Sequence, residues 1–393
     1  MAVAGPTVTE RDVEDAATLL EGRVRETPML PAGELSRHVG ARTLLKAENL
    51  QLTGSFKVRG ALNTIARLSP DELDCGVVAA SAGNHAQAVA WAARGAGARA
   101  KLVMPSTAPL AKVAAVRDYE GEVKLVEGSY DAAGEEAARV AEEEGRTLIH
   151  AFDQASIVAG QGTVGLEIGR QDPDVGLVVV PVGGGGLSSG IAVALAGRAR
   201  IVGVQAEERA GATICDGIAI KRPGAFTGPL VERFLDELVT VSDDEVAEAM
   251  VLLLERSKQV VEPAGAVGVA ALLHGRIAAP ASGSVCAVLS GGNVDASLLS
   301  ECIRLGETAA GRRMVIGTVI PDRPGALAGL LRLVAEHGAN VVDVEHLRDG
   351  IDLHVRETAI KLVLQIRGPD NGREIVEAAR AEGFAVAVER EVV

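Results

Sequence analysis

Short, almost purely apolar runs recur along the first three quarters of the chain and constrain its fold more than any other feature. They cover residues 77–80, 102–104, 123–126, 147–151, 177–182, 201–205 and 285–289. Most of the segments between them are rich in alanine at helical spacing, as at Ala86, Val89, Ala90 and Ala93. Apolar strands that alternate with helices predict a parallel sheet covered on both faces. Because ligands bind such sheets where loops leave the carboxyl ends of strands, we expect the chemistry in the strand-to-helix loops.

A different pattern begins after residues 306–313. The apolar spacing there predicts strand, helix, strand, strand, helix, strand over 314–320, 324–337, 340–348, 357–366, 372–382 and 385–388. This βαββαβ order is the ferredoxin-like split βαβ arrangement. We therefore predict an α/β domain over residues 1–312, in which a smaller subdomain covers about 51–150, and a second domain over 313–393.

Charge and cysteine usage limit the partners and the compartment. The formal net charge is −14, from 39 Lys and Arg against 53 Asp and Glu, which argues against nucleic-acid or anionic-membrane binding. The four cysteines, at 75, 215, 286 and 302, form no close pair and predict free thiols. The N-terminus has no signal-peptide pattern and the chain no membrane-length apolar run, so we expect a cytoplasmic protein.

Two polar loops in the α/β region contain candidate reactive and binding residues. The first, residues 53–61, places Lys57 at the start of a predicted helix and beside Arg59. A helix N-terminus and a neighbouring cation favour the neutral amine that covalent lysine chemistry requires. The second loop, Ser81 to Gln87, follows a predicted strand, and its amides at a helix start suit a carboxylate. The alternatives are a solvated lysine in the first loop and an ordinary N-cap in the second.

Two glycine-rich loops follow later strands. Four consecutive glycines, Gly183 to Gly186, precede a helix that we expect over 191–196. A turn needs fewer glycines, whereas a phosphate that contacts several amides explains them all. The spacing fits neither a dinucleotide nor an ATP fingerprint. In the last loop, 290–293, the hydroxyl of Ser290 could pair with a ring nitrogen, although taken alone this loop is better explained as an ordinary turn at the end of a strand.

Together with Glu262-Pro263-Ala264-Gly265-Ala266, the four loops occur in an order that resembles the tryptophan-synthase-type (fold type II) pyridoxal-phosphate enzymes. Within that group the chain resembles the threonine ammonia-lyases over about residues 8–312. The resemblance implies two open parallel-sheet subdomains and the cofactor pyridoxal 5'-phosphate.

The resemblance also implies a role for each loop. Lys57 would bond to the cofactor and later move the Cα proton, Phe56 would pack against the cofactor ring, and Asn84 would hydrogen-bond its phenolic oxygen. Ser290 would partner the pyridine nitrogen, and Glu262 would lie near that side of the ring. The residues implied for the phosphate are Gly183, Gly184, Gly185, Gly186 and Leu187. Those in the loop that would receive the substrate carboxylate are Ser81, Asn84 and His85.

One position separates two activities of the group. Serine racemases of this family carry a serine immediately before the Gly-Asn of the second loop, as the acid or base on the opposite face. This chain has Ala82 there, which favours elimination over racemisation. The racemases' metal-ligand pattern matches only at Glu207, so we predict no metal site.

The C-terminal domain resembles an ACT domain, through 321–327 and Asn340 on the βαββαβ pattern. In that family such a module binds an effector amino acid, and the implied effector residues are Asp322, Gly325, Ala326, Leu327 and Asn340. The alternative is a module that only dimerises through its edge strands.

These observations predict an allosterically regulated enzyme that converts L-threonine to 2-oxobutanoate and ammonia, and L-serine to pyruvate. Isoleucine and valine are the candidate effectors, and a homodimer or homotetramer is expected. One alternative is a serine dehydratase or serine racemase on the same scaffold. A second is an amino-acid sensor without catalytic activity, against which the retained Lys57 and the four glycines argue.

Overall fold

The computed structural model describes residues 7–209, 212–220, 223–348 and 353–389, and the chain divides into two compact units, Met1–Ala296 and Ser297–Val393. Helix α13 (Ala296–Ala309) therefore counts with the second unit, whereas the sequence prediction placed the boundary after residue 312.

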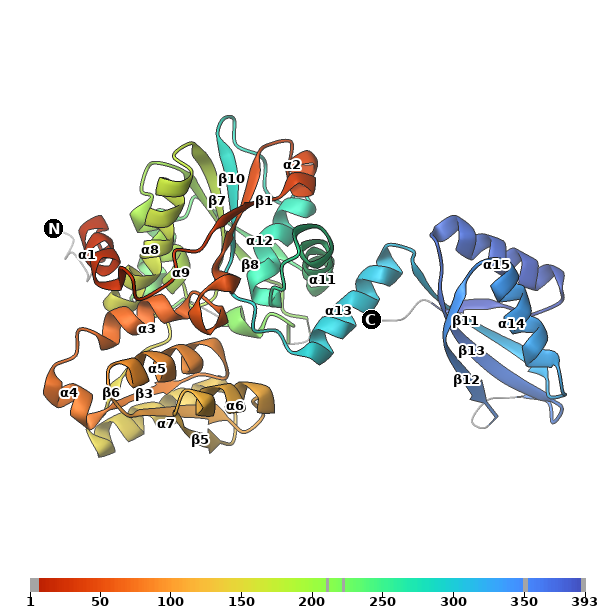
Figure 1. Cartoon of the computed structure of the whole chain (residues 1–393), viewed down its shortest axis with the longest axis horizontal. Coiled ribbons are helices and arrows are strands. Elements are labelled where there is room, and N and C mark those ends of the chain that lie inside the picture. The colour runs from red at the N-terminus through yellow and green to blue at the C-terminus, as the bar shows by residue number, and fades with distance from the viewer. Residues whose placement is uncertain (1–6, 210–211, 221–222, 349–352, 390–393) are drawn as a thin grey trace. The chain divides into compact units, whose positions relative to one another are not determined.

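Within the described residues, the larger sheet of the first unit has six strands in the order β1-β2-β10-β7-β8-β9 (Figure 1). All neighbours are parallel except β1 and β2. Helices α8 and α9 cover one face with apolar side chains, and α12 packs against β7, β8 and β10. The strands are β1 (Met29–Pro31), β2 (Thr43–Ala47), β7 (Val175–Pro181), β8 (Arg200–Ala206), β9 (Glu237–Val241) and β10 (Ser284–Leu289).

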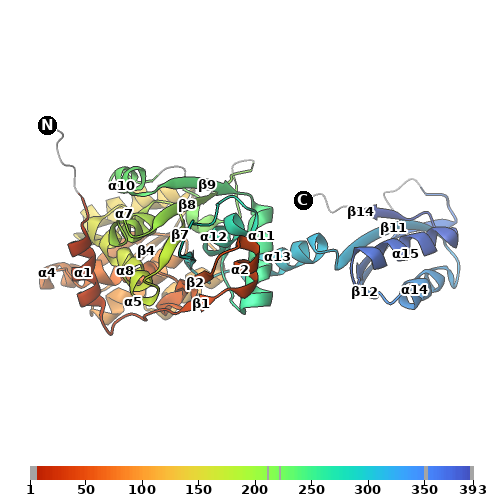
Figure 2. The ribbon, with the colours of Figure 1, turned by 90° about the horizontal axis from the view of Figure 1, so that it is seen from above.

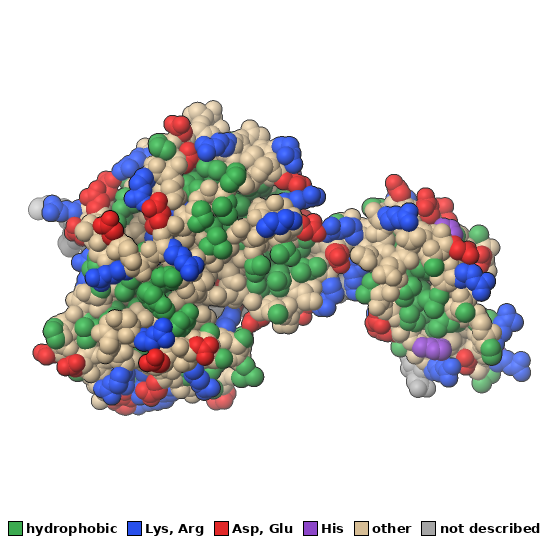
Figure 3. Space-filling model, in the orientation of Figure 1, with side chains coloured by type: hydrophobic (Ala, Val, Ile, Leu, Met, Phe, Trp, Pro, Cys, Tyr) green, Lys and Arg blue, Asp and Glu red, His purple; other side chains and the backbone are tan. Residues whose placement is uncertain are grey.

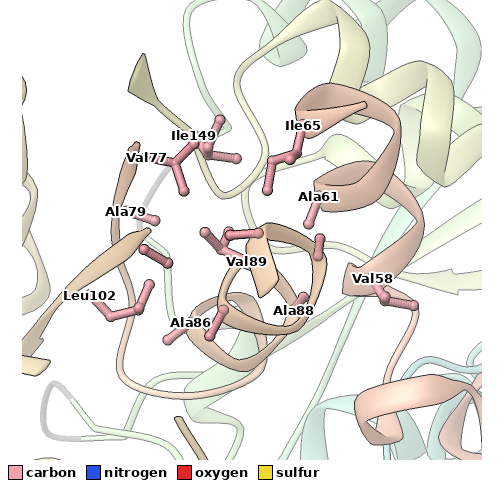
Figure 4. Close-up of a cluster of buried hydrophobic side chains, with 14 of the residues drawn as sticks. Val58, Ala61, Ile65, Val77, Ala79, Ala86, Ala88, Val89, Leu102 and Ile149 are labelled. Carbon is pink, nitrogen blue, oxygen red and sulfur yellow. The ribbon is translucent and has the colours of Figure 1, made fainter. Parts of the chain in front are cut away.

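The smaller sheet is parallel throughout, in the order β5-β4-β3-β6, as far as the described chain extends. Alternate residues of its strands face opposite layers. Val77, Ala79 and Leu102 pack against α3 and α5 (Figure 4), whereas Val78 and Val103 pack against α7. The strands are β3 (Val77–Ala80), β4 (Ala100–Pro105), β5 (Glu122–Val126) and β6 (Thr147–Leu148).

The helices of the first unit complete the predicted α/β alternation. They are α1 (Glu10–Leu20), α2 (Gly33–Val39), α3 (Lys57–Ile65), α4 (Pro70–Cys75), α5 (Asn84–Gly95), α6 (Leu110–Asp118), α7 (Tyr130–Glu144), α8 (Ala155–Gln171), α9 (Gly186–Ala194), α10 (Thr227–Phe234), α11 (Asp243–Leu252) and α12 (Pro263–Leu273).

Two predicted elements differ from the structure where the chain turns toward the site. The strand expected over 147–151 ends at Leu148, because the chain then leaves the sheet and the Ala151 carbonyl accepts a hydrogen bond from Lys57. The helix expected over 191–196 covers Gly186–Ala194 instead, and the residue before it, Gly185, adopts the left-handed conformation (φ +89°) that glycine permits.

The second unit confirms the βαββαβ prediction. Among its described residues, an antiparallel sheet in the order β12-β13-β11-β14 has α14 and α15 on one face (Figure 1, Figure 2). This strand order is that of the ferredoxin-like fold. The elements are β11 (Arg313–Pro321), α14 (Ala326–Glu336), β12 (Asn340–Leu347), β13 (Glu357–Gln365), α15 (Pro369–Ala381) and β14 (Ala387–Glu389).

The surface and the cysteines agree with a globular chain. Side chains of Lys, Arg, Asp and Glu are interspersed over the visible surface (Figure 3). In the part of the chain that the structure describes, no helix has both the length and the apolar character to cross a bilayer. The four cysteines all lie among the described residues and form no disulfide with one another.

Candidate active site

A cavity of about 400 Å³ in the first unit lies where the predicted loops meet. Each loop leaves the carboxyl end of a strand or begins a helix, which is where parallel sheets bind ligands. All of the site residues predicted for this domain line it. They are Phe56, Lys57, Ser81, Asn84, His85, Gly183, Gly184, Gly185, Gly186, Leu187, Glu262 and Ser290.

Lys57 is the first residue of α3, and its Nζ donates a hydrogen bond to the Ala151 carbonyl at 3.0 Å. Burial lowers the pKa of Lys57 to about 8, although the nearby Glu262 carboxylate opposes this shift. At pH 7 about one amine in ten is then neutral, far more than for a free lysine. The sequence argument credited Arg59 with this effect, but the Arg59 guanidinium binds Glu48 and Glu167 instead. Desolvation, and not a neighbouring cation, is the main cause.

The aromatic ring beside Lys57 and the last loop are connected through the backbone. The centroid of the Phe56 ring lies 5.2 Å from the Lys57 Nζ. The Phe56 N–H donates to the Ser290 carbonyl at 3.1 Å, so the first and last loops are held together at the cavity. Ser290 is buried at the cavity wall and offers a hydroxyl without a formal charge.

Glu262 precedes α12 and is buried beside Asn84. The Asn84 Nδ2 donates to the Glu262 Oε1 at 2.8 Å, and the Asn84 Oδ1 accepts from the Asn293 Nδ2 at 2.8 Å. Burial, together with the charge of Asp216, raises the pKa of Glu262 to about 7. The Glu262 carboxyl group therefore gains and loses its proton in nearly the same pH range as Lys57.

The second loop presents backbone amides more than side chains. The Ser81 Oγ accepts a hydrogen bond from the Gly83 N–H at 3.1 Å. The His85 Nε2 lies 3.0 Å from the Ile149 carbonyl, which can only accept, so this nitrogen carries the proton. Burial and the charge of Lys57 lower the pKa of His85 to about 3. The neutral ring therefore has no second proton to offer to a carboxylate.

Close packing explains why the third loop consists of glycines. A Cβ at Gly184 would lie 2.2 Å from the Phe152 ring, and one at Gly183 would lie 2.9 Å from the Ile218 Cα. The Gly184 carbonyl accepts from the Thr227 Oγ1 at 2.5 Å, and Asp153 accepts from the Thr227 N–H at 2.9 Å. This support holds the loop at the N-terminus of α9, where orphan amides and the helix dipole favour an anion.

The cavity suits a phosphorylated aldehyde. The glycine loop offers amides to a phosphate, and the buried Nε2 of Gln161, at the cavity wall, has no hydrogen-bond partner among the described residues. The poised Lys57 amine can bond to an aldehyde, and Phe56 can pack against a ring. The residues present therefore fit pyridoxal phosphate.

Some residues of this site carried no signal in the sequence. Gln161, Asp153 and Thr227 lie in ordinary helix or loop surroundings, and their roles follow only from the fold. Lys112 of α6 also lines the cavity and binds Asp216 at 2.7 Å. Among the described residues, no group of three or more His, Cys, Asp or Glu side chains could hold a metal ion.

The structure brings together only part of the predicted effector set. Asp322, Gly325, Ala326 and Leu327 lie between the end of β11 and the start of α14. Asn340 pairs with Gln365, which pairs with Arg313 at the start of β11. It therefore lies at the opposite end of the sheet, because α14 carries the chain back along β11 before β12 begins.

Comparison with known families and structures places the chain in a class. Residues 20–291 match the model of the family described as pyridoxal-phosphate dependent enzymes, and residues 314–370 match the ACT domain. The chain therefore belongs to the pyridoxal-phosphate-dependent enzymes, its cofactor is pyridoxal phosphate, and it carries a C-terminal ACT domain.

Individual relatives narrow that class. An L-threonine ammonia-lyase of Thermotoga maritima is 43% identical over 97% of this chain and 99% of its own length. Solved structures of maize serine racemase and of threonine deaminase isoform 2 from Solanum lycopersicum have TM-scores of 0.72 and 0.70. The maize enzyme is 32% identical to this chain, and the match covers 76% of this chain and 97% of the maize chain. The Solanum lycopersicum enzyme is 34% identical, and the match covers 75% of this chain and 92% of that chain. The predicted fold class is confirmed.

Proposed function

We propose that the protein is a threonine ammonia-lyase, which converts L-threonine to 2-oxobutanoate and ammonia and L-serine to pyruvate, under control of an amino acid bound to the ACT domain. The observation that carries the proposal is the position of Lys57, a half-buried lysine with a partly neutral amine, which lines one cavity together with the glycine loop. The L-threonine ammonia-lyase of Thermotoga maritima, similar over nearly the whole chain, supports the same substrate.

Bound pyridoxal phosphate supplies the electron sink that makes the Cα proton of an attached amino acid acidic and lets a β-substituent leave. Lys57 would hold the cofactor covalently, and its neutral amine, when free, would take the proton from Cα. Ser290 offers the ring nitrogen a neutral hydroxyl, so no carboxylate holds a proton there. Water leaves and is taken up again in the final hydrolysis, so the net products are the 2-oxo acid and ammonia.

Recognition of the substrate carboxylate rests on the second loop. The backbone N–H groups at the start of α5, including that of His85, are the donors we assign to the carboxylate, with the Ser81 hydroxyl beside them. The His85 side chain serves another purpose, because its one proton is used by the Ile149 carbonyl. It fixes the loop to the end of the smaller sheet.

The second candidate is racemisation of serine, which the similarity to maize serine racemase favours. Racemisation needs a proton donor on the face of Cα opposite Lys57. Ala82 lines the cavity and supplies none, so we favour elimination.

A 2-oxo-acid assay on the full-length protein with added pyridoxal phosphate tests the proposal. We expect turnover of L-threonine above L-serine, no turnover by the Lys57→Ala variant, and unreacted serine that stays in the L form. Accumulation of D-serine without 2-oxo acid would support the racemase instead. If neither amino acid gives a product, the remaining interpretation is an amino-acid sensor that has no catalytic activity.

Regulation is assigned to the turn between β11 and α14. Gly325 has φ +90° and precedes the first amides of α14, where an amino-acid carboxylate can bind. The Asp322 N–H donates to the Arg356 carbonyl at 2.7 Å, and the Asp322 carboxylate accepts from Arg348 at 3.1 Å. We assign effector binding to Asp322, Gly325, Ala326 and Leu327. Asn340 stays a prediction, because it lies at the other end of this sheet.

A further inference from the structure

Asn293, the last residue of the fourth loop, has no role in the function proposed above, yet it connects three of the loops. Its Nδ2 lies 2.8 Å from the Thr53 carbonyl and 2.8 Å from the Asn84 Oδ1. The Asn84 Nδ2 lies 2.8 Å from the Glu262 Oε1. These contacts form one series of hydrogen bonds, Thr53–Asn293–Asn84–Glu262, which we call the amide relay.

The direction of the amide relay is set at one end by the backbone. The Thr53 carbonyl can only accept, so the Asn293 atom beside it must be the amide nitrogen. The same nitrogen has a second proton, and the Asn84 atom that it faces must therefore be the carbonyl oxygen. The Asn84 amino group is then turned away from Asn293, toward the Glu262 carboxylate. It has two protons, of which Glu262 takes one and the other is left for the cavity.

Two glycines and one unusual backbone angle make room for the amide relay. A Cβ at Gly54 would lie 2.3 Å from the Asn293 Oδ1, and a Cβ at Gly291 would lie 2.3 Å from the Glu262 Oε1. Thr53 has φ +60°, which a β-branched residue rarely adopts. Strained conformations of this kind persist where the surrounding structure requires them. Here the conformation belongs to the residue whose carbonyl anchors the relay.

We propose that Asn293 is a positioning residue, which fixes the Asn84 amide so that its N–H, and not its oxygen, faces the coenzyme's phenolic oxygen. The inference rests on the proposed contact of Asn84 with the coenzyme and not on the choice of substrate. An N–H donor stabilises the ionised phenolic oxygen, whereas an amide oxygen in its place repels it. The relay thereby keeps the coenzyme in its ionised, visibly absorbing form.

The Asn293→Asp variant tests the amide relay in the full-length protein loaded with pyridoxal phosphate. A carboxylate only accepts, so it can satisfy neither the Thr53 carbonyl nor the Asn84 oxygen, and Asn84 must turn its oxygen around. We expect the ratio of visible to near-ultraviolet absorbance of the bound coenzyme to fall by about tenfold, because the ionised phenolic oxygen loses one hydrogen bond. Asn49→Asp is the matched control. Asn49 also joins two chain segments, through Gln259 and the Val260 carbonyl, and has no contact with Asn84.

Repeating the substitution in a protein that lacks Asn84 distinguishes loss of the amide relay from the electrostatic effect of the new carboxylate. In an Asn84→Ala protein we expect Asn293→Asp to change the absorbance ratio by less than about twofold, because no amide remains to be turned. An equal fall in both backgrounds, or an equal fall in the Asn49→Asp control, overturns the proposal, as does an unchanged ratio in Asn293→Asp itself.

If Asn293→Asp does not fold, Asn293→Leu decides in its place. It removes the donor without adding a charge, and we expect a smaller fall that again disappears with Asn84→Ala. An effect of Asn293→Leu that is independent of Asn84 overturns the proposal. The spectra are independent of threonine turnover, so failure here and failure of the proposed function are distinguishable.

Discussion

At the scale of single residues, the site depends on how burial changes the protonation of a few groups. The pKa of Lys57 falls to about 8 and that of Glu262 rises to about 7, with burial as the largest cause in both. The two groups also act on each other, since the Glu262 carboxylate raises the pKa of Lys57 and the Lys57 cation lowers that of Glu262. The charge of each therefore depends on the other in the physiological range.

This coupling predicts how fast the coenzyme-free protein takes up pyridoxal phosphate. Only the neutral Lys57 amine can attack the aldehyde, so the rate should fall about tenfold for each pH unit below a midpoint near 8, and level off above it. In Glu262→Gln the charge that raises the pKa of Lys57 is gone, so the midpoint should move to lower pH. Stopped-flow absorbance at a series of pH values measures both. A midpoint near the 10.5 of a free lysine would contradict the burial argument.

In the proposed function, one hydroxyl group missing at position 82 separates elimination from racemisation. Ala82→Ser places a hydroxyl at the cavity wall where the chain now has no proton donor. We expect the variant to convert L-serine partly to D-serine, with 2-oxo-acid formation reduced several-fold. Chiral chromatography of unreacted serine checks this, and Ala264→Ser, at another wall position of the same cavity, is the control. D-serine from the control as well would show that the position of the hydroxyl does not matter.

At the scale of elements, α3 is held by the residue two positions after Lys57. The Arg59 guanidinium is fully buried and binds the Glu48 carboxylate at 2.8 Å and the Glu167 carboxylate at 2.6 Å. Lys46, also buried, binds Glu167 at 2.6 Å. This network joins α3 to α8 and to the segment after β2, and thereby fixes the helix that begins with Lys57.

Arg59→Met should therefore lower the free energy of unfolding by about 3–5 kcal/mol, because it leaves two carboxylates buried beside a single cation. Arg139→Met is the control. Arg139 makes two ion pairs on the exposed surface of α7, and its loss should lower the free energy of unfolding far less, because solvent screens exposed ion pairs. Urea unfolding followed by circular dichroism measures the difference. Equal losses in the two variants would mean that the buried network contributes no more than surface pairs.

Strands were predictable where an uninterrupted apolar run fills both buried faces; β2 is equally buried but contains Thr43 and Lys46, and it was not predicted. Continuous apolar runs predicted β3, β4, β7, β8 and β10, but β9 alternates with exposed residues and β1 has three residues, so neither stood out. The four loops could be located in the sequence because glycine and polar residues interrupt the alternation of apolar strands and helices. Their pairing could not be predicted, since Asn84 and Asn293 are 209 positions apart and no local signal relates them. The same holds for Arg59, whose partners are fixed only by the fold.

At the scale of the whole molecule, an effector bound in the second unit has to change the activity of the first. Such coupling requires two states to which the effector binds with different affinity. The turn at Gly325 offers a way to test this without touching the active site. Gly325 and Gly383 both have φ +90°, and a Cβ at either one would meet no described atom within 4 Å. Substitution by alanine should therefore lower the free energy of unfolding by about 1–2 kcal/mol at each position, through backbone strain alone.

We expect Gly325→Ala to abolish the response of threonine turnover to added isoleucine or valine, with turnover in their absence within about twofold of the unaltered protein. Gly383→Ala carries the same backbone strain outside the turn and should keep the response. The measurement is the 2-oxo-acid assay with each amino acid titrated against both variants. If both variants lose the response, strain in the second unit is sufficient and the turn has no special part. If both keep it, the effector binds elsewhere, and the assignment of Asp322, Gly325, Ala326 and Leu327 fails while the catalytic proposal stands.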